Sequence, residues 1–387
     1  MSIGLSRRSF VAGAVAAMSM GASLSAIAAP AERRRFLLLI ELIGGNDGLN
    51  TIVPYGDESY ARIRGDLAIP AADVIPLEGG VLGFHPSLLP LRDIYKVGRL
   101  AVLQSVGHPW MRSGKDFGHL QAQHQSSLVA DVPHGGGGWA ARMGALQANR
   151  FDWRVAAAGL SFNCLDEGPL EGFGGLVSHH PNISGDHEVR VLQDLSSAPK
   201  EVMVGLGAQA LRFPSTPFGQ SMARCADLVL RMHSGASGYI PVLRVGIGSF
   251  DTHADQLQAH AKLLSEMALG IRAFYDVLSQ NSMVDRVLMM TYSEFGRSVI
   301  PNSRGGTDHG FSADHILIGD GIYGGYHGNR LRLGGDPSTF SAYSLDFRSI
   351  CAGILMEHFM VDSIPVLGPV RRHGIYKFSD RVPTNFA

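Results

Sequence analysis

The sequence predicts an α/β fold with a mainly parallel central sheet flanked by helices. Short apolar runs recur along the chain, and each ends in glycine or polar turn residues. A long segment with helical apolar spacing lies between two of these runs, as in strand–helix–strand units. The chain also has 48 glycines and only 17% charged residues, which suits a large core with many tight turns.

The N-terminus has the pattern of an export signal. Ser-Arg-Arg-Ser-Phe at 6–10 precedes a charge-free stretch, and Ala26-Ile27-Ala28 supplies a small-x-small cleavage pattern. A membrane anchor is the alternative, but a span needs roughly 17 to 25 strongly apolar residues, and this stretch is mostly Ala, Gly and Ser. We therefore expect a twin-arginine signal peptide over 1–29, the twin-arginine translocase as export partner, and a periplasmic or extracellular mature protein.

Composition excludes several partners. The net charge is -1 and no basic run is present, so nucleic acid is not expected. Past the signal no apolar stretch approaches membrane-spanning length, so no integral membrane segment is expected. Cys164, Cys225 and Cys351 are too few for a disulfide scaffold and lack metal spacing; they are predicted to be buried, with one bridge at most.

The first half of the chain predicts two strands and a helix. The apolar run 36–42 ends in Ile-Gly-Gly and reads as a buried strand. The run 100–106 repeats the pattern, and Ser113 then opens a capping box for a helix toward Val129. Between 132 and 238 glycine, proline, asparagine and serine recur, which predicts a loop-rich insertion within a single domain over 30–387.

The second half predicts three more strands and a long helix. The strands are expected over 242–247, 286–291 and 316–319, and the amphipathic helix over 254–278. Polar segments follow several of these strands. Because strand ends converge at one edge of a parallel sheet, the polar residues there are expected to meet.

Those segments carry the candidate metal ligands. The acids and histidines are Asp47, Asp251, His253, Glu294, Asp308 and His309. Carboxylate oxygens and imidazole nitrogens suit zinc, manganese or calcium, so a divalent metal cofactor is expected.

Three of the candidate segments have a structural alternative. Asp47 fits an ordinary Asn-Asp-Gly turn, and Asp251 fits a helix cap. Glu294 lies three residues before Arg297 and could pair with it, whereas the functional interpretation puts Glu294 on the metal and Arg297 on an oxyanion. His315 and His327 lie nearby and could be added ligands, but they are interpreted as loop residues.

The candidate catalytic residues are Ser113, His119 and Arg297. Gly-x-Ser-x-Gly, His-Glu-x-x-His and Cys/Ser-x-Pro-x-Arg are all absent from the sequence, which disfavours serine hydrolases, thermolysin-like proteases and formylglycine sulfatases. Ser113 at a helix N-terminus could act as nucleophile or only as a cap. His119 could act at the site, whereas His124 fits a solvated helix face.

Four motifs together resemble one bacterial family. They are Gly-Gly-Asn-Asp-Gly-Leu-Asn at 44–50, Phe-Asp-Thr-His-Ala-Asp-Gln at 250–256, Thr-Tyr-Ser-Glu-Phe-Gly-Arg at 291–297 and Gly-Thr-Asp-His-Gly at 306–310. In this order they resemble domain-of-unknown-function 1501, a twin-arginine-exported family grouped by fold with alkaline phosphatases and sulfatases. The resemblance implies an alkaline phosphatase-like fold that binds divalent metal at the C-terminal edge of its sheet.

The resemblance also implies roles for residues. Asp47 matches the first-strand metal aspartate, Asp251 with His253 matches the central ligand pair, and His309 matches the late histidine. Glu294-Phe295 stands where Asp-His is usual, so the resemblance does not imply a full two-metal complement.

The metal-ligand candidates and the family resemblance together indicate a hydrolase. The chain is expected to be an exported, metal-dependent hydrolase of phosphate or sulfate esters that acts on a small-molecule or polymer substrate. The alternative is a non-catalytic periplasmic or envelope binding protein that retains the fold.

Overall fold

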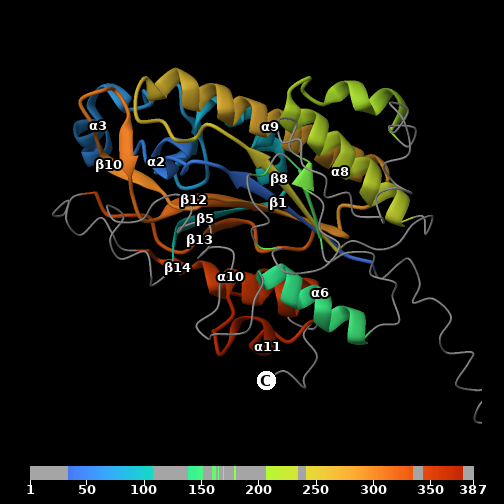
Figure 1. Ribbon diagram of the computed structural model, residues 1–387. Coiled ribbons are helices and arrows are strands. Elements are labelled where there is room, and N and C mark those ends of the chain that lie inside the picture. Colours follow the sequence, from blue (N-terminus) through green and yellow to red (C-terminus); the bar gives the residue numbers. More distant parts are fainter. Residues whose placement is uncertain are drawn as a thin grey trace, which may run out of the picture.

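A central sheet lies between two helical layers in the computed structural model (Figure 1). Helices α8 (Pro217–His233) and α9 (Gln256–Gln280) cover one face, and α6 (Trp139–Arg150), α10 (Phe347–Gly353) and α11 (Ile364–Leu367) cover the other. The structure describes residues 34–107, 138–150, 159–162, 164, 169, 178–179, 206–233, 241–333 and 343–377. This layering confirms the predicted α/β class.

Within the described residues the central sheet has nine strands in the order β13-β5-β12-β9-β1-β8-β6-β7, with β14 also paired to β5. Their bounds are β1 Phe36–Leu42, β5 Leu100–Gly107, β6 Gly159–Phe162, β7 Ser178–His179, β8 Val242–Ile247, β9 Val287–Tyr292, β12 Ala313–Ile318, β13 Gly325–His327 and β14 Leu345–Asp346. In the half of the sheet that runs from β9 through β1, β8 and β6 to β7, each strand is parallel to the next. Strand β12 is antiparallel to both β5 and β9. The sheet is therefore mainly parallel, as predicted.

The direction of β12 follows from the segment that precedes it. After β9 the chain forms the antiparallel pair β10 (Arg297–Pro301) and β11 (Thr307–His309), then enters β12 directly. Parallel strands need a long crossover, usually a helix. No helix separates β9 from β12 in this fully described stretch, so β12 returns antiparallel.

The strand predictions are confirmed closely. Strands β1 and β8 occupy the predicted ranges, and β5 ends one residue later than predicted. Strand β9 begins and ends one residue later, and β12 begins three residues earlier and ends one residue earlier. The predicted helix over 254–278 is α9. Apolar runs predict these strands well because the strands are buried on both faces and need apolar side chains throughout.

Helix α8 is a 17-residue element that the loop-rich interpretation of 132–238 did not anticipate. Its apolar residues have helical spacing, and Phe218, Met222 and Val229 are buried. The Thr216 hydroxyl accepts the Gly219 N–H at 3.1 Å, so Thr216 caps the helix and Pro217 occupies its first turn. Threonine and proline therefore begin a helix here and do not mark a loop.

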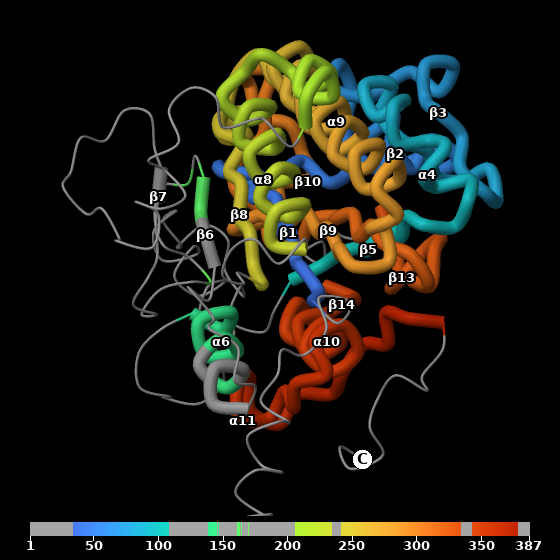
Figure 2. Tube along the Cα trace, turned by 90° about the vertical axis from the view of Figure 1, so that its right-hand side faces the viewer, coloured from blue at the N-terminus to red at the C-terminus, as the bar shows by residue number. Residues whose placement is uncertain are grey.

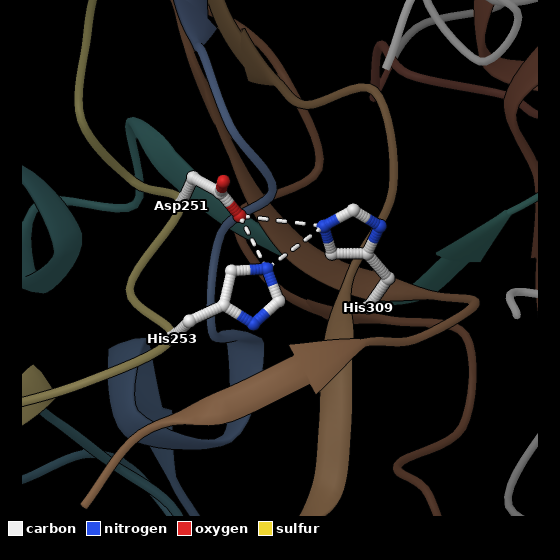
Figure 3. A group of neighbouring side chains, drawn as sticks. All are labelled: Asp251, His253 and His309. Carbon is white, nitrogen blue, oxygen red and sulfur yellow. Dashed lines mark hydrogen bonds and ion pairs between the residues drawn. The ribbon is translucent and has the colours of Figure 1, made fainter. Parts of the chain in front are cut away.

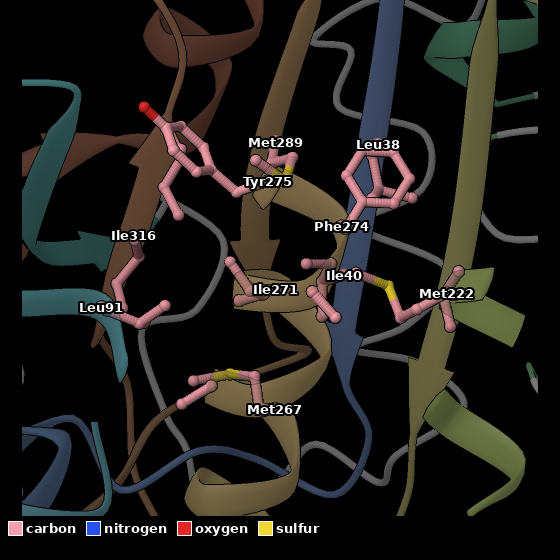
Figure 4. Packing of buried hydrophobic residues seen from close by; sticks show 14 of the residues in the cluster. Leu38, Ile40, Leu91, Met222, Met267, Ile271, Phe274, Tyr275, Met289 and Ile316 are labelled. Carbon is pink, nitrogen blue, oxygen red and sulfur yellow. The ribbon is translucent and has the colours of Figure 1, made fainter. Parts of the chain in front are cut away.

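The main core lies between the sheet and the helices α8 and α9. Figure 4 shows Leu38 and Ile40 of β1 facing Ile271 and Phe274 of α9. Alternate residues of β1, such as Leu39, pack in a second core against α10 and the segment after it. Each face of the sheet is therefore closed by helices.

Smaller elements surround these layers. They are α2 Gly48–Thr51, β2 Ile52–Val53, α3 Glu58–Arg64, the 3-10 turn Gly65–Leu67, β3 Ile75–Pro76, β4 Gly83–Phe84, the 3-10 helix Pro86–Leu91, α4 Arg92–Lys96, the 3-10 helix Gly207–Arg212 and the π-helical segment Ile354–His358. Figure 2 shows β2, β3 and α4 gathered at one end of the molecule, away from α6 and α11. None of the described helices has both the length and the apolar character to cross a membrane.

The parallel strands β1, β8 and β9 end at one edge of the sheet. Their registers align Leu42 with Ile247 and Glu41 with Tyr292. The segments that follow these strands are therefore neighbours, and a bridge between Asn46 and Gly296 joins two of them. Pairing of Arg297 with His309 brings β11 to the same place.

Candidate metal centre

Asp251, His253 and His309 converge at this edge of the sheet (Figure 3). Asp251 and His253 belong to the segment between β8 and α9, and His309 ends β11. The Asp251 Oδ1 atom lies 3.0 Å from His253 Nε2 and 3.3 Å from His309 Nε2. The two imidazole Nε2 atoms are 3.1 Å apart. Three potential ligand atoms therefore form a small, nearly equilateral triangle.

This spacing fits one transition-metal ion. Ligands held about 2.0 to 2.1 Å from zinc at tetrahedral corners are about 3.3 Å from one another. The separations of 3.0, 3.1 and 3.3 Å are close to that edge length. A set of two histidines and one carboxylate suits zinc or manganese, and a fourth position would remain for water or substrate.

Asp308 orients His253 from the opposite side of the ring. Its Oδ1 atom lies 3.3 Å from His253 Nδ1, and the Asn302 side-chain amide donates to the same oxygen at 3.2 Å. The Asn302 hydrogen bond, and then that of His253, hold the pKa of Asp308 below its usual range. An ionised Asp308 favours the proton on Nδ1 of His253, which leaves the Nε2 lone pair for a metal.

The ring of His309 packs against Phe295, with ring centroids 4.3 Å apart. Phe295 therefore fixes the plane of a candidate ligand by contact and supplies no ligand of its own. In the resemblance described above, Phe295 stands where the histidine of an Asp-His pair is usual.

Arg297 is buried beneath the triangle and joins the surrounding loops. Its guanidinium donates to the carbonyl oxygens of Gly45 at 2.9 Å and Thr307 at 3.1 Å, and also to those of Gly44 and Phe250. It also forms an ion pair with Asp251. Arg297 thus places a fixed positive charge beside the candidate ligand carboxylate.

Two glycines make this packing possible. A Cβ atom on Gly306 would lie 2.3 Å from the carbonyl carbon of His253, and one on Gly310 would lie 2.4 Å from that of Arg297. The glycines on both sides of the Thr-Asp-His segment are therefore explained by close backbone approach.

Asp47 is buried and engaged with protein groups. It caps α2 by accepting the Asn50 N–H at 3.3 Å, and its other oxygen contacts the side chains of Arg64 and Gln256. Glu294 is also buried and accepts the Gly44 N–H at 2.8 Å.

The structure thus brings Asp251, His253 and His309 together, with Asp308 behind His253. Direct metal binding by Asp47, Glu294 and Asp308 stays a prediction. The catalytic candidates Ser113 and His119 lie outside the described residues.

The interpretation of His315 as a loop residue is wrong. His315 lies within β12 and is buried, which lowers its pKa to about 3. The apolar residues 316–318 that follow it were predicted as a strand, so extension of that strand back through the histidine was the available signal. His327 ends β13 and contacts His373, with 2.8 Å between Nδ1 and Nε2.

Sequence reasoning did not assign roles to Arg64, Gln256 and Asn302. Gln256 lies within the Phe-Asp-Thr-His-Ala-Asp-Gln motif itself, so its position was a usable signal. Arg64 and Asn302 belong to no motif and could be identified only from the folded structure.

Comparison with known proteins gives one family match. The family model described as "Protein of unknown function (DUF1501)" matches residues 182–351. No curated protein matches.

Several solved structures resemble the chain. The lipoteichoic acid synthase LtaP from Listeria monocytogenes has a TM-score of 0.41 at 9% identity, covering 90% of this chain and 74% of that one. A protein of glycosaminoglycan metabolism from Bacteroides thetaiotaomicron has a TM-score of 0.45 at 9% identity, covering 88% and 75%. A protein in the alkaline phosphatase superfamily from Vibrio parahaemolyticus has a TM-score of 0.36 at 10% identity, covering 84% and 66%. At these values none of them assigns a site or a reaction to this chain.

Proposed function

We propose that the protein is a divalent-metal-dependent hydrolase of phosphate or sulfate esters and that it belongs, over its mature length, to the DUF1501 family. The observation that carries the proposal is the triangle of Asp251, His253 and His309, whose edges fit one metal ion. An ion held there supplies polarisation of an ester oxygen and activation of water.

Charge at the site favours an anionic substrate. One carboxylate and two neutral imidazoles leave a bound divalent ion with net positive charge, and the Arg297 guanidinium adds to it. The side chains of Asp251 and His253 are 40% and 31% exposed, so an ester can reach them. Ser113 and His119 are proposed as the nucleophile and the acid-base group, with Arg297 as an electrostatic contributor beside Asp251.

A substrate panel tests this function. The mature protein is to be assayed with 4-nitrophenyl phosphate, a phosphodiester analogue and 4-nitrophenyl sulfate, each with added zinc, manganese or calcium. We expect turnover of one ester class that is abolished by chelation and restored by one of these metals. If no ester is hydrolysed with any metal, the non-catalytic binding protein becomes the better description.

One observation favours that second candidate. The Asp47 carboxylate, which resemblance assigns to a metal, is occupied by Arg64 and Gln256. A protein that keeps one metal for structure or ligand binding would need no second metal carboxylate.

We also propose twin-arginine export to the periplasm or beyond, from the Arg7-Arg8 pair and the cleavage pattern near Ala29. Arg7→Lys together with Arg8→Lys keeps the charge but removes the pair that the translocase recognises. We expect this variant to stay in the cytoplasm on cell fractionation. Unchanged periplasmic yield would point to a general secretory signal or to none.

A further inference from the structure

Gln256, the first residue of α9, connects the two segments that carry the candidate ligands. Its side chain is fully buried, and its Oε1 atom accepts the Thr252 hydroxyl at 3.0 Å and the Thr307 hydroxyl at 2.6 Å. Thr252 stands between Asp251 and His253, and Thr307 begins the strand that ends at His309. One amide oxygen therefore spans the gap between both ligand segments.

The other end of the amide is fixed by charge. Gln256 Nε2 donates to Asp47 Oδ2, which also accepts from Arg64 Nη2. An ionised carboxylate only accepts hydrogen bonds, so the amide must turn its NH2 group toward Asp47 and its oxygen toward the threonines. The Asp47–Arg64 pair thus sets the orientation of Gln256.

Arg64 extends the same network to β10. Its Nη1 atom donates to the carbonyl oxygens of Ser298 at 3.1 Å and Val299 at 3.2 Å. Strand β10 pairs with β11 through Arg297 and His309. The network therefore reaches His309 by two routes, through Thr307 and through β10.

We propose that Gln256, oriented by the Asp47–Arg64 ion pair, is a positioning residue that holds the two ligand segments at the spacing one metal ion requires. This inference rests on the proposed metal site but not on the proposed reaction. Glutamine suits the position because it combines one acceptor for two hydroxyls with one donor for a carboxylate. Glutamate would set a second carboxylate against Asp47, and methionine would leave both hydroxyls without this acceptor.

Zinc affinity of the folded protein tests the proposal. The purified mature protein, freed of metal with a chelator, is titrated with zinc in a calorimeter well below the melting temperature. We expect Gln256→Met to weaken zinc binding by roughly 10- to 100-fold, the usual effect of losing a residue that orients ligands. We expect the cobalt-substituted variant to show an altered visible spectrum, because the ligand geometry changes.

A matched control separates positioning from general stability. Asn50 is another buried amide beside Asp47. Its side chain donates to the Leu67 carbonyl at 2.8 Å and accepts from the Tyr60 hydroxyl at 2.8 Å, and neither of these hydrogen bonds goes to a ligand segment. We expect Asn50→Leu to lower the melting temperature with zinc affinity and cobalt spectrum unchanged. Thr307→Val is a milder test that weakens zinc binding, and Thr307→Ser restores it by returning the hydroxyl.

The outcomes distinguish the possible failures. Wild-type zinc affinity and cobalt spectra in Gln256→Met or Thr307→Val, with only a lower melting temperature, would overturn the positioning role. A wild-type protein that binds none of the tested metals would overturn both the site and this proposal. Zinc binding that responds to Gln256 without any ester turnover would support positioning and count against the hydrolase function alone.

Discussion

His309→Ala is expected to weaken binding of a divalent ion by roughly 100-fold or more, because it removes one corner of the ligand triangle. Two remaining ligands, Asp251 and His253, cannot enclose the ion, and Asp251 is shared with Arg297. Asp251→Ala is expected to act in the same direction. Elemental mass spectrometry after dialysis measures the metal that each variant retains.

The control for this experiment is His327→Ala. His327 is also a partly buried histidine in a contact with another imidazole, but it belongs to the His373 pair and not to the triangle. We expect it to retain metal like the wild type. Stoichiometric metal in both His309→Ala and Asp251→Ala would show that the ion binds elsewhere or not at all.

Lowering the pH from 7 to 5 is expected to reduce the free energy of unfolding of the metal-free protein by about 3 kcal/mol. Burial lowers the pKa of His85 and His260 to about 4 and that of His315 to about 3, from an ordinary value of 6.5. Below pH 6.5 the unfolded chain takes up protons at these histidines while the folded chain does not. The stability that these three neutral histidines contribute to the folded state is therefore fully present above pH 6.5. It declines as the pH falls toward their pKa values in the folded protein.

Asp314 opposes this loss. Burial raises its pKa from 3.8 to about 7, so between these values the folded chain binds a proton that the unfolded chain does not. Its contribution grows as the pH falls from 7, and it cancels somewhat less than half of the histidine effect over this interval, at about 1.4 kcal/mol per pKa unit. The balance remains destabilising because three histidines oppose one carboxyl group.

Urea unfolding at pH 7 and pH 5 in the presence of chelator measures the difference. In His260→Gln the side-chain amide can still donate to the Asn46 oxygen that His260 contacts at 3.0 Å, but it does not titrate. This variant is expected to lose about 2 kcal/mol less on acidification. Equal stability of the wild-type protein at both pH values would contradict the assignment of neutral buried histidines.

The strands and the ligand-bearing turns were predictable because their signals are local. An apolar run such as 36–42 must be buried on both faces, and the polar residues that follow β8 must lie at the sheet edge. His309 was predictable as a site candidate because glycines flank its segment. Its meeting with His253 depends on the β10–β11 pairing, which no local signal specifies.

The environment of Asp47 was not predictable from its motif. A carboxylate after the first strand suits a metal or a turn equally well, and the choice depends on Arg64, which reaches it from α3. Gln256 belongs to a motif, but its role depends on its hydrogen bonds to Thr252, Thr307 and Asp47, which only the fold brings together. Long-range contacts of this kind depend on the tertiary fold and leave little trace in sequence periodicity.

The buried Arg64 guanidinium allows folding to precede the binding of a metal ion. It is a permanent counter-charge encoded by the chain, so the carboxylate at the end of β1 is neutralised as soon as the core forms. A carboxylate that relied on a dissociable ion would tie folding to the local supply of that ion. Under the proposed function, the scaffold can therefore fold first and acquire a metal ion afterwards, in whichever compartment that ion is available.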